Sequence, residues 1–221
     1  DSDDCLPRGM LAAAARAFAQ RPDVAVVHGL ADVVDEQGER VIAEYGGRDL
    51  STDAFHVLLK YNIGPPNTFV VRRDVLATTG LFDVALRSCE DWDLWLRVAA
   101  MGGQFQLARD MRSVYRVVPG SMSKNVETMW RSACTVVRKS GQLHPNCRTC
   151  RDTRKASVAG FALSMRPLLR DLVHSPGGPS RAMGILIRNP RLMAWQMIWQ
   201  LRRTFRLESW TTVQQRLAAG R

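Results

Sequence analysis

Strand-like and helix-like patterns alternate along the first 118 residues, and this alternation constrains the fold more than any single motif. The alanine-rich segment 7–23 has the composition of a helix, and residues 24–35 (VAVVHGLADVVD) form an apolar, β-branched run typical of a strand. A turn over 36–39 leads into a returning strand over 40–45. Strands and helices mixed at this spacing predict an α/β protein built in layers.

The alternation continues beyond an irregular Gly-Pro-Pro-Asn segment at 64–67. Residues 68–73 (TFVVRR) are typical of a short buried strand, and 73–80 predict a helical turn closed by glycine. A helix is expected over 90–103 and one or two further strands over 104–118. This arrangement places the acidic pair Glu90-Asp91 at the start of a helix.

The net charge of +10 is divided unevenly along the chain. Residues 1–130 carry 14 Lys and Arg against 18 Asp and Glu, a net −4, whereas residues 131–221 carry 17 against 3, a net +14. We therefore expect one domain over 1–125, followed by a basic, mostly helical region over 126–221. Such a region favours an anionic partner, although a basic helical face that is merely solvated accounts for the same composition.

Composition and cysteine usage limit the class of protein. The chain has 221 residues, 46% of them hydrophobic, and contains no run of eighteen apolar residues, so we expect no transmembrane helix. Its five cysteines are an odd number and are mostly scattered, which does not resemble a secreted disulfide framework. We therefore expect a reducing, cytoplasmic location.

Two acidic clusters stand where a helix is expected to begin. The chain opens DSDDCLPRGM, with three carboxylates in its first four residues, and the second cluster is Glu90-Asp91. Acidic residues in a first helical turn contribute roughly 0.3–1 kcal/mol, so helix capping by itself explains either cluster. The occurrence of both in one domain favours a functional interpretation.

Three motifs in order resemble the family 2 inverting glycosyltransferases of the GT-A fold. They are DSDDCLPRGML, GLFDVALRSCEDWDLWLR and VYRVVPGSMS, and the resemblance covers residues 1–125. It implies a partial GT-A fold that lacks its N-terminal half and begins at the DXD motif. It also implies transfer of a sugar, with inversion, from a nucleotide-diphospho-sugar to an acceptor hydroxyl.

The resemblance assigns roles to the two acidic clusters. Asp1 would lie near the donor ribose and the metal, and Asp3 would ligate Mg²⁺ or Mn²⁺, because a departing diphosphate needs a hard cation with oxygen ligands. Asp91 would be the base that removes the acceptor proton, with Glu90 binding or orienting the acceptor. We expect Asp4 to cap the alanine-rich helix instead.

Other residues carry weaker expectations. Asn67 would shape the donor and acceptor pocket, or is a turn residue; Trp92 would stack on a sugar, or packs in the core. Arg116 would reach the diphosphate, or forms a surface ion pair. Val118 stands where many relatives carry a histidine that can bind the metal.

The expected acceptor is a glycan or a lipid-linked molecule of cell-surface polysaccharide or glycolipid synthesis. A catalytically inactive GT-A-like module that binds glycans or scaffolds a complex is the alternative, which Val118 and the missing half favour. We expect no nucleic-acid partner, because no groove-reading element is recognisable.

The basic region predicts helices over 154–175 and 181–206, separated by a break at 176–180. Trp195 and Trp199 among arginines are typical of a helix at a membrane interface, which would hold the protein at the inner face, or of a helix packed on its own domain. His144, Cys147 and Cys150 offer three zinc ligands, but a solitary Cys-x-x-Cys favours a helix start or loop with buried thiols.

Overall fold

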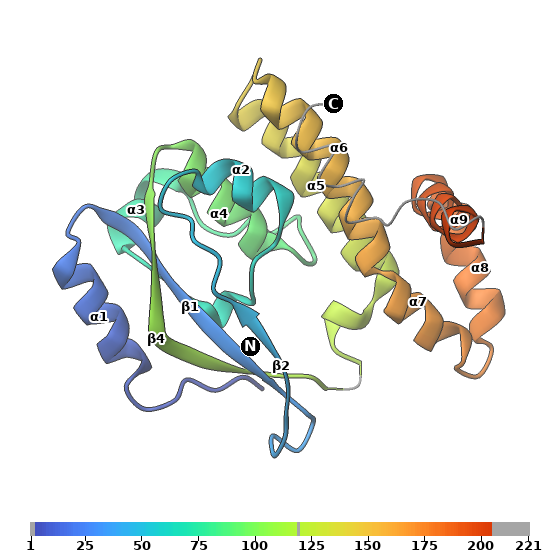
Figure 1. Cartoon of the computed structure of the whole chain (residues 1–221), viewed down its shortest axis with the longest axis horizontal. Coiled ribbons are helices and arrows are strands. Elements are labelled where there is room, and N and C mark those ends of the chain that lie inside the picture. Colours follow the sequence, from blue (N-terminus) through green and yellow to red (C-terminus); the bar gives the residue numbers. More distant parts are fainter. Residues whose placement is uncertain (1–2, 119, 205–221) are drawn as a thin grey trace. The chain divides into compact units, whose positions relative to one another are not determined.

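A computed structural model describes residues 3–118 and 120–204 and divides the chain into two compact units. Unit 1 is Asp1–Ser121 and unit 2 is Met122–Arg221, so the division falls four residues before the boundary expected from the sequence. Unit 1 combines a small mixed sheet with helices, and the described part of unit 2 is helical (Figure 1). The chain is therefore an α/β protein, as the sequence predicts.

The sheet of unit 1 is built on strand β1 (Val24–Val34). Strand β4 (Gln104–Arg116) pairs parallel with β1 at both of its ends, with a register shift between Leu107 and Arg112 (Figure 1). Strands β2 (Val41–Gly46) and β3 (Phe69–Val71) pair antiparallel with residues 30–34 and 26–28 of β1. Because β4 takes one edge of β1 at both ends, β2 and β3 share the other edge.

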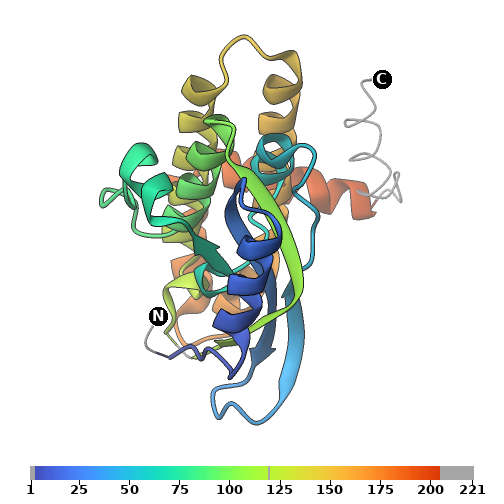
Figure 2. The same ribbon diagram turned by 90° about the vertical axis from the view of Figure 1, so that its left-hand side faces the viewer.

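Helix α1 (Met10–Gln20) covers one face of this sheet (Figure 2). Its alanines and Met10 pack against Val24 and Val27 of β1 and against Met111 of β4. The sequence suggested a helix that begins at Pro7, but α1 begins at Met10. Gly9 lies in the left-handed region (φ 89°) and is the N-cap, so the helix does not extend back through it.

The remaining helices of unit 1 are α2 (Ala54–Lys60), α3 (Arg73–Thr79) and α4 (Glu90–Ala100), with a 3₁₀ turn η1 at Pro66–Thr68. Helix α4 joins the sheet through aromatic stacking. The ring of Phe69 on β3 lies 5.7 Å from that of His28 on β1 and 4.4 Å from that of Trp95 on α4. Both ring nitrogens of His28 are buried without a hydrogen-bond partner among the described residues.

Unit 2 contains η2 (Met122–Lys124) and helices α5 (Val126–Leu143), α6 (Arg148–Ser164), α7 (Arg166–Val173), α8 (Gly178–Arg188) and α9 (Pro190–Thr204). Helices α5 and α6 are joined by a short turn and lie side by side (Figure 1). Trp130, Met165 and Leu192 belong to one buried cluster that holds α5, α6, α7 and α9 together.

The helices of unit 2 are shorter than the sequence suggested. The expected helix over 154–175 is divided between α6 and α7, with Pro167 in the first turn of α7. The expected helix over 181–206 is divided at Asn189, which precedes Pro190, and its residues 205 and 206 lie outside the described residues. A proline disfavours helical geometry in the residue before it, which explains the break at Asn189. Within residues 3–118 and 120–204, no helix combines the length and apolarity needed to cross a bilayer.

The burial of His28 predicts acid sensitivity. Desolvation lowers its pKa from 6.5 to about 4. Between these two pH values, His28 is mostly protonated in the unfolded state and mostly neutral in the folded state. As the pH falls from 6.5 to 4, unit 1 should lose about 3 kcal/mol of unfolding free energy from this group. Urea unfolding of wild type and His28→Leu at several pH values measures this loss. The variant should lack that part of the pH dependence, and identical profiles would contradict the assignment.

Candidate functional site

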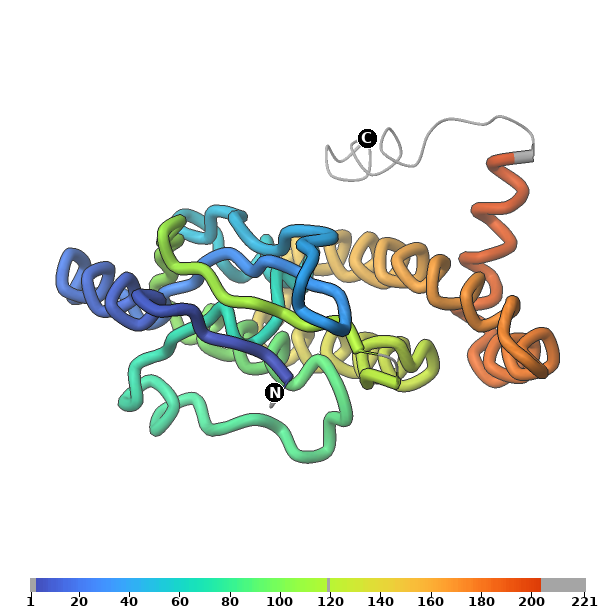
Figure 3. Tube along the Cα trace, turned by 90° about the horizontal axis from the view of Figure 1, so that it is seen from below, coloured from blue at the N-terminus to red at the C-terminus, as the bar shows by residue number. Residues whose placement is uncertain are grey.

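The acidic N-terminal segment is anchored along the free edge of β4. Cys5 and Val114 exchange two backbone hydrogen bonds, of 3.1 and 2.9 Å, as an antiparallel bridge. Two residues further along β4, the backbone N–H of Arg116 donates to Asp4 Oδ1 at 3.1 Å. The segment therefore runs beside the end of β4, as Figure 3 shows. Asp1 lies outside the described residues, and Asp3 is partly exposed.

Arg116 fixes this segment through its side chain as well. Its guanidinium donates from Nε to the carbonyl oxygen of Asp3 at 3.1 Å and from Nη1 to that of Glu36 at 3.0 Å. The group thus ties the acidic segment to the turn between β1 and β2. These contacts favour a positioning role for Arg116 over direct contact with a diphosphate, which was one of the roles expected from the sequence.

Asp4 does not cap the alanine-rich helix, so that expectation was wrong. The N-cap of α1 is Gly9, whereas Asp4 accepts from the backbone of Arg116. Burial raises the pKa of the Asp4 carboxyl, although its hydrogen bond with Arg116 opposes the shift. Its second oxygen, Oδ2, is buried and has no hydrogen-bond partner among the described residues. A carboxylate oxygen next to Asp3 is therefore available to another group.

Asn67 joins the same corner of the molecule. Its Nδ2 donates to the carbonyl oxygen of Val114 at 3.1 Å, and its Oδ1 accepts from Ser113 Oγ at 3.2 Å. The Val114 carbonyl also accepts from Cys5, so Asn67 lies directly beside the acidic segment. The structure thus brings Asp3, Asn67 and Arg116 together, although they are far apart in the sequence.

Asp91 is a buried carboxyl in the first turn of α4. Its pKa rises from 3.8 to about 7, first because burial removes water from the charged form and next because the charge of Glu90 lies nearby. Hydrogen bonds to the backbone N–H of Trp92 (2.7 Å) and to the side chain of Asn62 oppose the rise. A carboxyl with this pKa exchanges its proton near neutral pH, which is the property that a general base needs.

The backbone at the start of α4 helps to position this carboxyl. Cys89, the N-cap, has a left-handed φ of 58°, an uncommon conformation for a residue with a side chain. Burial raises the pKa of its thiol to about 12, so Cys89 is no nucleophile at neutral pH. Its contribution is the turn that places Glu90 and Asp91 at the helix end.

The other acidic residues of EDWDLWLR have different surroundings. Asp93 is buried and forms an ion pair of 2.9 Å with Arg97, whose guanidinium also binds the carbonyls of Thr79 and Leu81. Asp93 therefore holds the preceding loop in place. Glu90 is only partly buried, and its charge helps to raise the pKa of Asp91. No cation is among the described groups that act on the pKa of Asp91.

Trp92 lies in the core beside Asp91. Its side chain is only 1% exposed, and Nε1 donates to the carbonyl oxygen of Leu58 at the end of α2 at 2.6 Å. The ring thus joins α4 to α2, which favours the core-packing role of Trp92 over sugar stacking.

Asn62 was not predicted from the sequence, yet it connects the two acidic clusters. It begins the loop that ends at Asn67, so one end of the loop bonds to Asp91 and the other lies beside Asp3 and Asp4. The sequence signal for it was a polar residue directly after the C-cap of α2 and two residues before a Gly-Pro-Pro segment. The loop over residues 62–67 therefore contacts Asp91 at one end and the Val114 carbonyl beside the acidic segment at the other.

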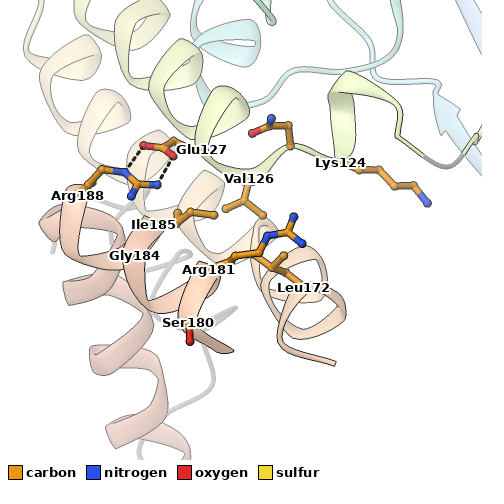
Figure 4. Close-up of a pocket in the computed structure, with 10 residues that line it drawn as sticks. Lys124, Val126, Glu127, Leu172, Ser180, Arg181, Gly184, Ile185 and Arg188 are labelled. Carbon is orange, nitrogen blue, oxygen red and sulfur yellow. Dashed lines mark hydrogen bonds and ion pairs between the residues drawn. The ribbon is translucent and has the colours of Figure 1, made fainter. Parts of the chain in front are cut away.

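A pocket of about 480 Å³ lies within unit 2 (Figure 4). Lys124, Arg181 and Arg188 contribute positive charge to its lining, and Arg188 pairs with Glu127 at 2.7 Å. None of the residues predicted for sugar transfer belongs to this pocket.

The tryptophans of the basic region have partners within unit 2. Trp195 packs against the core cluster, and the guanidinium of Arg166 lies 3.0 Å from the ring centroid of Trp199. Met197 and Leu201 are more than half exposed on α9, which leaves apolar surface among arginines. The membrane contact expected from the sequence stays a prediction.

A scan against protein-family models and a search of curated proteins both find no match to this chain. A functional assignment therefore depends on the residues and their geometry.

The contacts of Arg116 predict how firmly the acidic segment is held. Replacing it by Gln removes the charged donor to Asp3 and Glu36, so the amide of Cys5 should exchange its hydrogen roughly tenfold faster or more. Amides of the β1–β3 pairing should keep their protection. Hydrogen exchange read by NMR measures both, with Arg109→Gln, at an exposed position of the same strand, as the matched control. Unchanged exchange at Cys5 would contradict the positioning role.

Proposed function

We propose that unit 1 belongs to a GT-A-type inverting glycosyltransferase that moves a sugar from a nucleotide-diphospho-sugar to an acceptor hydroxyl. The observation that carries the proposal is Asp91, a buried carboxyl with a pKa of about 7 at the start of a helix. The type of reaction is inferred from the resemblance of the three sequence motifs to family 2 inverting glycosyltransferases. The convergence of Asp3, Asp4 and Asn67 beside the end of β4 supports it independently.

In the proposed reaction, Asp91 takes the proton of the acceptor hydroxyl while that oxygen attacks the anomeric carbon. The bond from this carbon to the diphosphate oxygen breaks on the opposite face, which inverts the configuration. Burial tunes Asp91 for this role, since an ordinary aspartate with a pKa near 3.8 is a weaker base. Asn62 donates to the carboxyl and so orients it.

A divalent cation fits the acidic segment. The carboxylate of Asp3 is partly exposed, and Asp4 Oδ2 is a buried oxygen without a partner among the described residues. Oxygen donors of this kind suit Mg²⁺ or Mn²⁺. Asp3, aided by Asp4, would hold the ion, which would supply positive charge for the departing diphosphate. The backbone N–H of Arg116 holds the Asp4 carboxylate, and the Arg116 guanidinium holds the backbone carbonyl of Asp3.

A catalytically inactive module that binds glycans is the second candidate. Val118 favours it, because an aliphatic side chain cannot ligate a metal where many relatives have histidine. The raised pKa of Asp91 favours the enzyme. A pKa of about 7 means that the fold bears the cost of a buried charge at neutral pH, which a binding module does not need.

The base assignment predicts both a rate and a pH profile. Asp91→Asn keeps the shape and an oxygen that can accept from the backbone N–H of Trp92, but it cannot take a proton, so turnover should fall about 10²–10⁴-fold. Wild-type kcat/KM should rise with pH through an inflection near 7, where Asp91 loses its proton. Sugar transfer and donor affinity, measured for both proteins across pH, test this directly. Donor affinity should barely change.

Glu90→Gln is the matched control. It removes the neighbouring negative charge that raises the pKa of Asp91, so the inflection should move to lower pH but persist. Near-wild-type turnover in folded Asp91→Asn would exclude Asp91 as the base. An absence of transfer by the wild type with every nucleotide sugar tried would favour the inactive module.

A further inference from the structure

The turn between α5 and α6 gathers three side chains that can bind a metal. His144 is the C-cap of α5 and Cys147 is the N-cap of α6, while Cys150 lies one turn into α6. The donor atoms His144 Nδ1, Cys147 Sγ and Cys150 Sγ all lie within 4.8 Å of one another. The Cys-x-x-Cys spacing by itself favours a helix start with buried thiols. Cys147 does start the helix and Cys150 is fully buried, but the turn also adds the imidazole.

The distances are close to those of a metal site. Zinc bonds of about 2.3 Å to sulfur and about 2.0–2.1 Å to nitrogen place tetrahedral ligands roughly 3.5–3.8 Å apart. His144 Nδ1 lies 3.1 Å from Cys150 Sγ, and no pair of the donor atoms is farther apart than 4.8 Å, so shifts of up to roughly 1 Å admit the ion. Asn146, with a left-handed φ of 62°, makes the tight turn that directs His144 and Cys147 to the same place.

The surroundings suit thiolate ligands. Cys147 Sγ accepts the backbone N–H of Cys150 at 3.4 Å, and such a donor stabilises charge on a metal-bound sulfur. The N-terminal end of α6 carries a partial positive charge, which favours negative groups there. His144 is exposed, which leaves a route by which the ion enters.

We propose that His144, Cys147 and Cys150 bind one Zn²⁺ ion, with the fourth position filled by water or by a donor from outside the turn. Two thiolates and one imidazole select zinc over the Mg²⁺ or Mn²⁺ proposed for the acidic segment, because soft sulfur ligands disfavour those hard cations. The ion would tie the end of α5 to the start of α6. This site is independent of sugar transfer, so either proposal can fail without the other.

Metal titration of the reduced, chelator-treated chain without a polyhistidine tag tests the proposal. Co²⁺ should produce the intense visible and thiolate charge-transfer bands of a tetrahedral sulfur-containing site, and Zn²⁺ should abolish them at one ion per chain. Native mass spectrometry should count a single zinc ion, and zinc should raise the Tm of the protein, since it binds only the folded turn.

Variants connect the signal to the three residues. His144→Asn, Cys147→Ser and Cys150→Ser should each weaken zinc binding by about 100-fold or more, because loss of a ligand exceeds loss of a supporting contact. Cys134→Ser, which changes a cysteine of α5 away from the turn, should bind zinc as the wild type does. If Cys150→Ser fails to fold because that position is buried, the exposed His144→Asn variant keeps the test decisive.

Three results would overturn the proposal. They are no zinc uptake by the reduced wild type, unchanged affinity in folded His144→Asn and Cys147→Ser, or cobalt bands that lack sulfur charge transfer. A Cys147–Cys150 disulfide in a protein that takes up no zinc when reduced would assign the turn to redox chemistry instead.

Discussion

The parallel pairing of β1 with β4 is the interaction on which unit 1 depends. It is not uniform, because β4 carries extra residues between Leu107 and Arg112 where β1 advances only from His28 to Leu30. Gly29 makes this irregularity possible, since a Cβ atom there would lie 2.0 Å from the carbonyl oxygen of Met111. The pairing then continues to Arg116, whose backbone and side chain hold the acidic segment.

The same sheet prepares the environment of Asp91. Phe69 on β3 stacks on Trp95 of α4, and Trp92 donates a hydrogen bond to a carbonyl of α2. These contacts fix the start of α4 in a buried environment. One helix thus carries carboxyls with different properties. Arg97 pairs with Asp93, whereas burial leaves Asp91 with a pKa of about 7. Enzymes separate the roles of neighbouring carboxyls in this way, by environment rather than by residue type.

Much of unit 1 could be predicted because its signals are local. The apolar run of β1 and the glycine after α3 belong to short stretches whose own chemistry defines them. The start of α1 could not be predicted because it depends on the left-handed conformation of Gly9. Since Gly9 is the N-cap, Asp4 cannot have the capping role expected from the sequence. The contacts of Arg116 and Asn62 join distant segments, which no local pattern predicts.

The basic region shows the same limit. Its helical character could be predicted from composition, but the break at Asn189 and the convergence of His144 with Cys150 depend on turn geometry. A Cys-x-x-Cys pair alone was weak evidence for a metal. The third donor, brought by the Asn146 turn, is what changes the interpretation.

The fold holds Asp91 as a buried carboxyl poised to exchange a proton near neutral pH. An NMR titration of the carboxyl carbons in protein labelled at aspartate measures this directly, with the Asp91 signal assigned by its absence in Asp91→Asn. We expect a midpoint of about 7 for Asp91. A midpoint near the ordinary 3.8 would show a solvated carboxylate and would exclude Asp91 as a base that burial has tuned.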